Sequence, residues 1–295
     1  MQTSGWTGKR AKAVFLTILA GVLWGTSFPA IKIGLSYVDT YLFVFLRFLL
    51  ASALMLLIMV SAKKITFPVK EKKLILFLGI ANGAAYLLQY VGMTSASATV
   101  AALFINLSAV WVALLSPRLQ GETLGRRKIL GVLAALTGVI FVTTNLDFSM
   151  LNGQLIGDLL LVTSGIVWAF FIIYNKDLVM KSHNTLQSLT WVLPVTLLPM
   201  VPFALPSANE VTALPIQAWL AIVYTAVMCW IVPYYLWLEG LKHISASTST
   251  ILLLSEILVA TAISYVLLNE TLTLISVVGA SLIVIAIVLV SYRSE

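Results

Sequence analysis

Long apolar stretches, separated by short charged or turn-forming segments, follow one another along almost the whole chain. They occupy residues 13–33, 41–62, 74–92, 97–117, 129–145, 155–175, 186–205, 216–238, 246–267 and 273–292. An α-helix needs about 20 apolar residues to cross the hydrocarbon layer of a bilayer. Because 60% of the residues are apolar and only 10% are charged, the chain has too little polar surface to coat a soluble globule. We therefore predict an all-α polytopic membrane protein with ten transmembrane helices, in contact with the lipid bilayer.

The net charge of +7 is explained by orientation in the membrane. When the N-terminus is placed inside, the inner segments hold 16 of the 18 Lys and Arg residues, and the outer connectors hold none of the others. Basic residues gather in cytoplasmic loops of membrane proteins. We predict a multi-pass protein of the cell membrane, plasma or inner, with both termini cytoplasmic. The basic balance then gives no evidence for nucleic acid, and we predict no nucleic-acid partner.

The two halves of the chain resemble each other. Near the start of each half the offset between matching residues is 144, in the pairs Gly21 and Gly165, Trp24 and Trp168, and Lys32 and Lys176. Later the offset is 148. There Gly92, Ser97, Ala98, the triplet Glu122-Thr123-Leu124 and Gly131 match, in the same order, Gly240, Ser245, Ala246, the triplet Glu270-Thr271-Leu272 and Gly279. An ordered series of this kind indicates duplication. Each copy has five spans, so the second enters the membrane from the opposite face. We predict two inverted five-helix repeats, residues 1–146 and 147–295, an arrangement used by secondary transporters.

The sequence also resembles the drug/metabolite transporter superfamily, specifically its ten-helix EamA-type members. The resemblance rests on LAGVLWGTSFP (19–29), FLRFLLA (45–51), GETL (121–124), GDLLLVTSGIVWA (157–169), LSEILVA (254–260) and NETL (269–272). It covers essentially the whole chain and implies a transporter fold, with substrates drawn from amino acids, organic cations, sugars and other metabolites. Many members have a proline in the ninth span where this chain has Ile257, and the matching position in the fourth span is Ala109. A proline kink is therefore not expected at either place.

One acidic residue lies near the middle of a predicted span. Charged side chains at bilayer depth are costly and mark functional sites or internal pairs. Glu256 occupies this position in the ninth span. We interpret it as a proton-coupling carboxylate or as a counter-charge for a cationic substrate. The structural alternative is a carboxylate in a hydrogen-bonded network that only locks helix packing.

Other polar and aromatic residues at bilayer depth are candidates for lining a substrate cavity. The third span carries a stripe at helical spacing, and further candidates lie in the first, fourth, sixth and eighth spans. They are Asn82, Tyr86, Gln89 and Tyr90 in the stripe, Asn106, the repeat-related Trp24 and Trp168, and Trp230. The alternative for each is a hydrogen bond or packing contact between helices. An acid among aromatic rings suits an organic cation, but the same rings also stack on amino-acid substrates.

Several further residues are expected to have structural roles. Lys32 and Arg47, near outer helix ends, are expected to snorkel, to cap carbonyls or to pair with Asp39, and the functional alternative for them is an outer gate or anion selector. Trp237, near an inner helix end, is expected in the cytoplasmic aromatic belt. The carboxylates Asp158, Glu122 and Glu270 lie beside helix starts, where they complement the helix dipole. The Gly21-xxx-Gly25 and Gly79-xxx-Gly83 pairs indicate close helix packing.

These observations favour a secondary transporter that moves a small metabolite, an amino acid or an organic cation, by alternating access through a central cavity. No Walker A sequence is present, so ATP does not drive transport directly through this chain. Proton coupling, exchange and facilitated diffusion remain open at this stage. The alternative is a passive channel or facilitator for small polar solutes. An intramembrane enzyme is disfavoured, because HExxH and GxSxG motifs and a Cys–His pair are missing. We predict no cofactor and, with only His183 and His243, no metal site.

Overall fold

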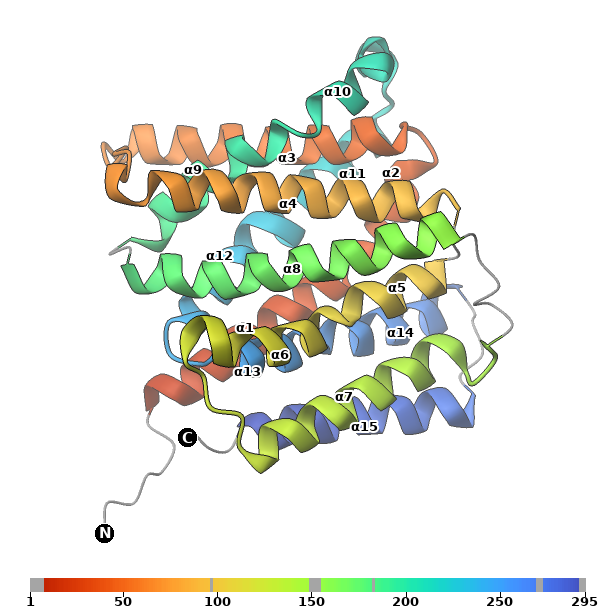
Figure 1. Cartoon of the computed structure of the whole chain (residues 1–295). Helices are drawn as coiled ribbons and strands as arrows, with labels where there is room; N and C mark the ends of the chain where they lie inside the picture. The colour runs from red at the N-terminus through yellow and green to blue at the C-terminus, as the bar shows by residue number, and fades with distance from the viewer. Residues whose placement is uncertain (1–7, 96–97, 149–154, 182–183, 269–272, 292–295) are drawn as a thin grey trace.

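The computed structural model describes residues 8–95, 98–148, 155–181, 184–268 and 273–291, and within these ranges the regular structure is helical. The helices run side by side in one bundle (Figure 1). Nine of the described helices are long and apolar enough to cross a membrane, and a bent pair, Thr185–Leu197 with Val201–Ala213, makes ten. The predicted all-α, polytopic membrane fold is confirmed.

The first five spans come from the first half of the chain. They are α1 (Gly8–Gly25) with α2 (Ser27–Leu35), α3 (Thr40–Ser61), α4 (Lys72–Met93) preceded by the turn η1 (Val69–Glu71), α5 (Ala98–Asn106) with α6 (Ser108–Gln120), and α7 (Arg126–Thr144). The second half supplies α8 (Leu155–Lys181), α9 (Thr185–Leu197) with α10 (Val201–Ala204) and η3 (Leu205–Ala213), α11 (Ile216–Ala226) with the π-helical η4 (Val227–Ile231) and α12 (Val232–Leu241), α13 (Ala246–Leu253) with α14 (Ser255–Leu268), and α15 (Leu274–Ser291).

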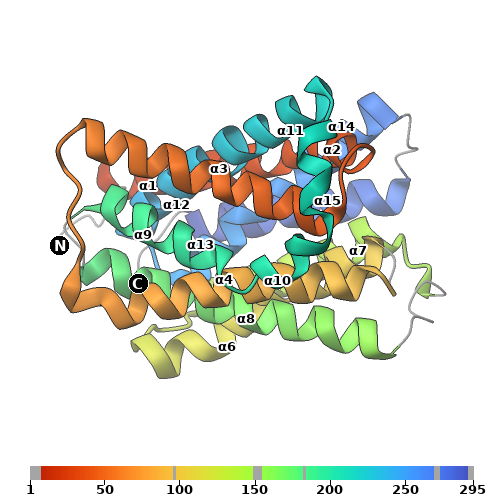
Figure 2. The same cartoon turned by 90° about the horizontal axis from the view of Figure 1, so that it is seen from above.

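The start of α1 and the end of α15 lie at the same end of the bundle (Figure 1). We call this the terminal end and the other the distal end. At the distal end the chain after α9 bends by 52°. The bent segment crosses over the first part of α3, where the rings of Tyr41 and Phe203 lie 5.8 Å apart (Figure 2).

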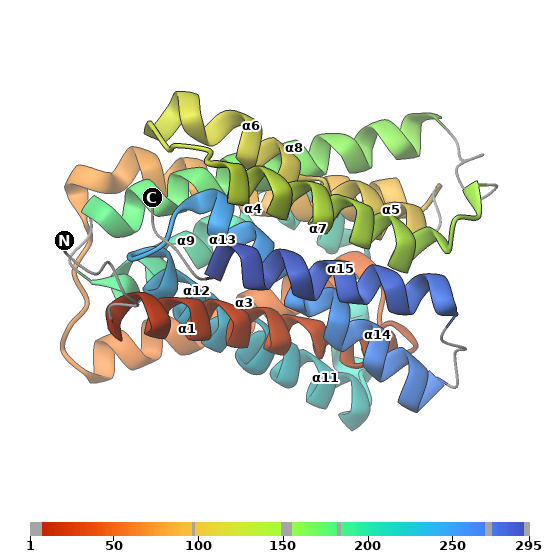
Figure 3. The same cartoon turned by 90° about the horizontal axis from the view of Figure 1, so that it is seen from below.

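The contacts between helices follow the expected inverted repeat. In the first half, α1 packs against α12, α13 and α14 (Figure 3). Its counterpart α8 packs in the same way against α4, α5 and α6. The pairs α3 with α9 and α7 with α15 each join a span to its own counterpart. This reciprocal pattern is what a pseudo-twofold axis in the membrane plane produces.

Two repeat-related spans are broken near their middle without a proline at the break. α5 ends before Leu107 and α13 ends before Leu254. At both breaks the backbone makes tighter i to i+3 hydrogen bonds, from Val110 N to Leu107 O and from Ile257 N to Leu254 O. The missing proline therefore does not keep these spans continuous.

Helix α1 crosses the second break at very close range. A Cβ atom at Gly25 would lie 2.6 Å from the carbonyl oxygen of Glu256, and one at Gly21 would lie 2.9 Å from the carbonyl oxygen of Leu253. The packing role predicted for this glycine pair is confirmed. Glycine at both positions allows α1 to contact the backbone at the start of α14.

Candidate functional site

Aromatic side chains from both halves of the chain meet in the middle of the bundle. They are Trp24 on α1, Phe48 on α3, Tyr86 on α4, Trp168 and Phe171 on α8, Trp230 in η4, and Tyr234 and Trp237 on α12. We call these eight residues the central aromatic cluster. Aromatic pairs of this kind contribute packing area and favour edge-to-face geometry.

Trp230 connects the parts of this cluster and is only 2% exposed. Its ring centroid lies 4.8 Å from Phe48, 5.8 Å from Tyr86 and 6.3 Å from Trp24. Tyr86 in turn meets Trp168 edge to face at 5.1 Å. The structure thus brings together four of the predicted cavity residues: Trp24, Tyr86, Trp168 and Trp230.

The repeat explains a member of the cluster that was not among the predicted cavity residues. Tyr234 lies 148 residues after Tyr86, which is the offset that relates the later parts of the two halves. Tyr234 is fully buried, and its hydroxyl donates to Oδ1 of Asn175 over 2.8 Å. Applying the repeat offset to the stripe on the third span would have identified it.

The prediction for Trp237 is wrong. This residue is 1% exposed, and its Nε1 donates to Oγ of Ser249 over 2.8 Å. Its ring lies 6.0 Å from Trp24. Helical side chains lean toward the N-terminus of their helix, and for α12 that direction is the bundle centre rather than the terminal end. Trp237 therefore belongs to the core of the bundle.

The prediction for Arg47 is wrong as well. Arg47 is 4% exposed and donates from Nη2 to the hydroxyl of Tyr86 over 3.1 Å. Its guanidinium carbon lies 5.0 Å from the ring of Phe48 and 5.1 Å from that of Tyr86. Asp39 instead caps α3 by accepting from the backbone of Tyr41 and Leu42. Arg47 lies two turns into α3 and faces the bundle, so its head group does not reach the surface.

Glu256 lies in the first turn of α14, directly after the break in the ninth span. Its backbone contacts Gly25, the neighbour of Trp24. Among the described residues, its carboxylate makes no hydrogen bond and no ion pair. A carboxylate at this place benefits from the partial positive charge of the helix start. The helix start thus stabilises the carboxylate of Glu256 at this position, and the carboxylate remains available for a ligand.

Two other residues of the predicted stripe on α4 differ in their contacts. Tyr90, 8% exposed, stacks on Tyr86 at 6.3 Å and an interplanar angle of 18°. Asn82 is fully buried and donates from Nδ2 to Oγ1 of Thr196 over 3.1 Å, so it links α4 to α9. Tyr90 extends the aromatic cluster, whereas Asn82 bonds to a helix outside it.

The last two predicted cavity residues are partly buried. Gln89 lies on α4 between Tyr86 and Tyr90 in sequence. Asn106 is the last residue of α5, and its Nδ2 donates back to the carbonyl oxygen of Ala102 over 2.8 Å. This bond satisfies one donor of Asn106 within its own helix, at the break of the fourth span.

Several buried polar atoms of the bundle lack a hydrogen-bond partner among the described residues. The nitrogen atoms are Nε1 of Trp24, Trp111, Trp168 and Trp230, and Nε of Arg47, and the oxygen atoms are Oδ1 of Asn82 and Asp158 and Oγ of Ser116. A buried polar group that lacks a partner costs roughly 1–3 kcal/mol, so such groups need an explanation. For the nitrogen atoms, a bound ligand with acceptor atoms would provide one.

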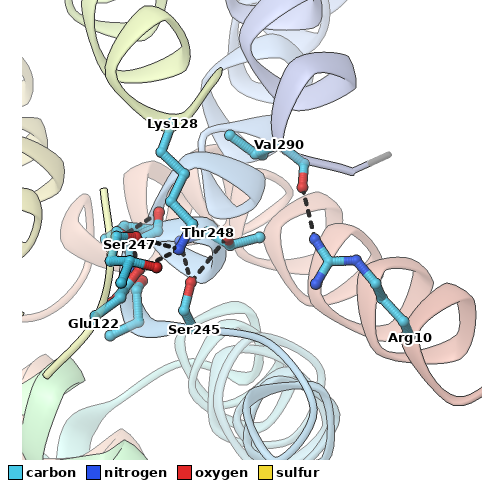
Figure 4. A network of polar contacts seen from close by, with 10 residues as sticks. Arg10, Glu122, Lys128, Ser245, Ser247, Thr248 and Val290 are labelled. Carbon is cyan, nitrogen blue, oxygen red and sulfur yellow. Dashed lines mark hydrogen bonds and ion pairs between the residues drawn. The ribbon is translucent and has the colours of Figure 1, made fainter. Parts of the chain in front are cut away.

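A polar network packs the terminal end of the bundle (Figure 4). Glu122, in the loop between α6 and α7, accepts from Nζ of Lys128 over 3.1 Å and from the hydroxyl of Ser247 at the start of α13. Ser245 caps α13 by accepting from Thr248 N over 3.3 Å. Glu122 was predicted beside the start of its own next helix, but it also binds the ninth span. Its repeat counterpart Glu270 lies outside the described residues.

The charge state of Glu122 follows from this network. Burial alone favours the protonated carboxyl, but hydrogen bonds from Ser247 and Ser245 and the ammonium of Lys128 outweigh it and hold the pKa of Glu122 below its ordinary value. Lys128 is 9% exposed. Glu122 is therefore ionised near neutral pH and, through Ser247, links the first half of the chain to the second.

The chemistry available for a metal is limited in the part of the chain that the structure describes. Within it, no three His, Cys, Asp or Glu side chains come together in a way that could hold a metal ion. Cys229 is buried, with its Sγ 3.9 Å from Oγ1 of Thr26. The site therefore consists of aromatic rings, hydrogen-bond donors, the buried Arg47 and the carboxylate of Glu256.

Comparison with known proteins identifies relatives along the whole chain. The model of the EamA-like transporter family matches residues 11–144 and again residues 155–292, once in each half. An uncharacterized transporter of Archaeoglobus fulgidus is 28% identical, covering 97% of this chain and 99% of its own. Proteins named probable amino-acid metabolite efflux pump in Salmonella typhimurium and Escherichia coli are 29% and 27% identical, with 91% of each chain covered. A solved crystal structure covers 94% of this chain and 95% of its own with a TM-score of 0.73 at 17% identity, which shows the shared fold.

Proposed function

The chain belongs to the EamA-like transporter family, and we propose that it moves a small metabolite across the cell membrane by alternating access through the central aromatic cluster. The single observation that carries this proposal is the convergence of both halves on one buried group of aromatic rings, which holds indole donors without partners among the described residues and lies beside Glu256 in the first turn of α14. Secondary transporters with inverted repeats bind their substrates near the midplane, between the repeats.

The substrate class proposed is an amino acid or an organic cation. Trp24, Tyr86, Trp168 and Trp230 supply flat faces for either. A cation over an aromatic face gains electrostatic energy, and amino-acid side chains stack on the same faces. The relatives named as amino-acid metabolite efflux pumps support the first class.

Alternating access would use the pseudo-twofold relation between the halves. In this structure contacts of Glu122 hold the terminal end together. Glu122, in the loop after α6, accepts from Lys128 in the first half and from Ser247 on α13 in the second half. Opening toward the terminal end would require these contacts to part. The two halves would then rock about the axis between them.

Glu256 is proposed as the coupling group. It is acidic, lies at the break of the ninth span and has no partner among the described residues. Such a carboxylate exchanges a proton more readily than one held in an ion pair, because no fixed cation stabilises its charged form. This supports proton-driven transport over simple facilitated diffusion.

We propose that the terminal end faces the cytoplasm. Basic residues on this end are Lys9, Lys12, Lys63, Lys64, Arg126, Arg127 and Lys181. The positive-inside rule assigns such an end to the cytoplasm. Both termini would then be cytoplasmic.

The experiment that tests transport is solute counterflow in proteoliposomes that contain the purified full-length chain. Vesicles are preloaded with an unlabelled amino acid or quaternary amine, and uptake of the labelled compound is followed. An alternating-access carrier gives a transient accumulation that depends on the preload and saturates. A passive pore gives uptake that no preload stimulates, and this result for every compound would refute the proposal.

A further inference from the structure

A buried arginine without an acidic partner suggests what the substrate carries. Arg47 is 4% exposed, and its side chain donates a hydrogen bond to the hydroxyl of Tyr86. The ion pairs of the described residues, Lys128 with Glu122 and Lys242 with Glu239, do not include it. A desolvated charge that lacks a counter-charge is strongly unfavourable. Two aromatic faces offset only part of this cost.

The donors around Arg47 point to a missing anionic group. Nε of Arg47 is buried and has no hydrogen-bond partner among the described residues, and the same holds for Nε1 of Trp230, whose ring meets Phe48 at 4.8 Å. Guanidinium groups bind carboxylates through two parallel N–H donors, and here the Nε donor is unused. These two groups are donors, so a ligand that satisfies them must supply acceptor atoms.

Glu256 supplies a carboxylate beside the same cluster. Its backbone contacts Gly25, the neighbour of Trp24, and the ring of Trp24 reaches Trp230. Arg47 and Glu256 do not pair with each other, since no ion pair within 4.0 Å joins them. The two ionisable groups thus lie beside one aromatic cluster without an ion pair between them.

We propose, on the basis of the proposed transport function, that the substrate is a zwitterion of the amino-acid type whose carboxylate binds Arg47 and whose ammonium group binds Glu256. The carboxylate would accept from Arg47 and from the free indole N–H groups. The ammonium would face Glu256 and the rings beside it. A cation without a carboxylate would leave Arg47 uncompensated, and an anion without an amine would leave Glu256 uncompensated. A zwitterion neutralises both.

Binding to the purified full-length protein tests this assignment. The twenty standard L-amino acids are screened by thermal shift, because a ligand of the folded state raises its melting temperature. The amino acid that gives the largest shift is then compared with its primary amide, which lacks the carboxylate, and with its deamino acid, which lacks the ammonium. We expect roughly 30-fold or greater loss of affinity for each analogue, the scale for removing one partner of a buried charge pair.

Variants assign each charge to a residue. In Arg47→Gln the amino acid should bind no better than its amide, while the amide keeps its wild-type affinity. In Glu256→Gln the amino acid should bind no better than its deamino acid. The control Lys32→Gln removes an exposed cation of the same half and should keep wild-type discrimination. If Arg47→Gln does not fold, the test is the comparison of the amino acid with its amide on the wild-type protein. An amide whose affinity is within threefold of that of the amino acid contradicts the proposal.

Other outcomes separate this inference from the transport function. If no amino acid raises the melting temperature, or if Arg47→Gln keeps the wild-type preference for the amino acid over its amide, the zwitterion assignment is overturned. Counterflow of benzyltrimethylammonium, a cation without a carboxylate, in the absence of counterflow for any amino acid would overturn the assignment but leave the transporter intact. Amino-acid binding with the expected discrimination but no counterflow of any compound would overturn the transport function and leave the zwitterion assignment intact.

Discussion

The ammonium of Lys128 lies 3.1 Å from the carboxylate of Glu122, and both side chains are nearly buried, with 11% and 7% of their surfaces exposed. The same carboxylate accepts from Ser247, so the pair joins the loop after α6 to the start of α13. Breaking a buried ion pair by removing one partner costs roughly 3 kcal/mol. We expect Glu122→Gln to lower the melting temperature of the detergent-purified protein at neutral pH.

The pH dependence of this effect has a definite sign. Because the pKa of folded Glu122 is held below its ordinary value, ionised Glu122 stabilises the folded state above that value, and this contribution is lost as the pH falls through the folded-state pKa. The difference in melting temperature between wild type and Glu122→Gln should therefore disappear as the pH is lowered. The control Glu239→Gln removes a partly exposed carboxylate paired with Lys242 and should cost less than about 1 kcal/mol. A difference in melting temperature between wild type and Glu122→Gln that is constant from neutral to acidic pH would contradict stabilisation by ionised Glu122.

The coupling role of Glu256 predicts a selective loss. Glu256→Gln keeps the shape of the side chain but cannot exchange a proton, so an imposed pH gradient should no longer drive accumulation in proteoliposomes. Yield and size-exclusion profile should match those of wild type. Counterflow at substrate concentrations high enough to offset weaker binding should persist, which separates coupling from binding. Accumulation driven by the pH gradient at wild-type levels in this variant would remove the coupling role.

The hydrogen bond between Asn82 and Thr196 predicts a stability effect without a binding effect. Asn82 shares a stripe with the cavity residues, but its contact is to α9. A double-mutant cycle of Asn82→Ala and Thr196→Val should give a coupling energy of about 0.6 kcal/mol, the average for hydrogen bonds between membrane helices, and no more than about 1.7 kcal/mol. Substrate affinity should change less than threefold. A tenfold loss of affinity at unchanged stability would instead place Asn82 in the substrate site.

The fold was predictable to a large extent because its determinants are local and periodic. Apolar stretches of about 20 residues determine spans whatever their neighbours are. The offset that relates Trp24 to Trp168 revealed the duplication. The breaks at Leu107 and Leu254 were not predictable, since they occur without the proline that would have marked them.

The site was only partly predictable, because the direction of a side chain depends on packing between distant segments. Arg47 and Trp237 were assigned to helix ends from their distance along the sequence. Their actual environments come from contacts with Tyr86 on α4 and Ser249 on α13. Residues chosen by helical spacing and by the repeat, such as Trp24 and Tyr86, do meet in space. Rotation of each helix within the bundle is the information that hydropathy lacks.

The central claim is that one site in the middle of the bundle serves both faces of the membrane. The most direct measurement is the half-saturation concentration of counterflow, determined from each face of the proteoliposome in wild type and in Trp24→Ala. Loss of a central aromatic contact should raise the half-saturation concentration at least about tenfold from both faces. The matched control is Trp191→Ala, which removes a tryptophan packed on Phe67 outside the cluster. It should leave the half-saturation concentration unchanged from both faces. An unchanged value for Trp24→Ala, or a change from one face only, would contradict a single alternating site.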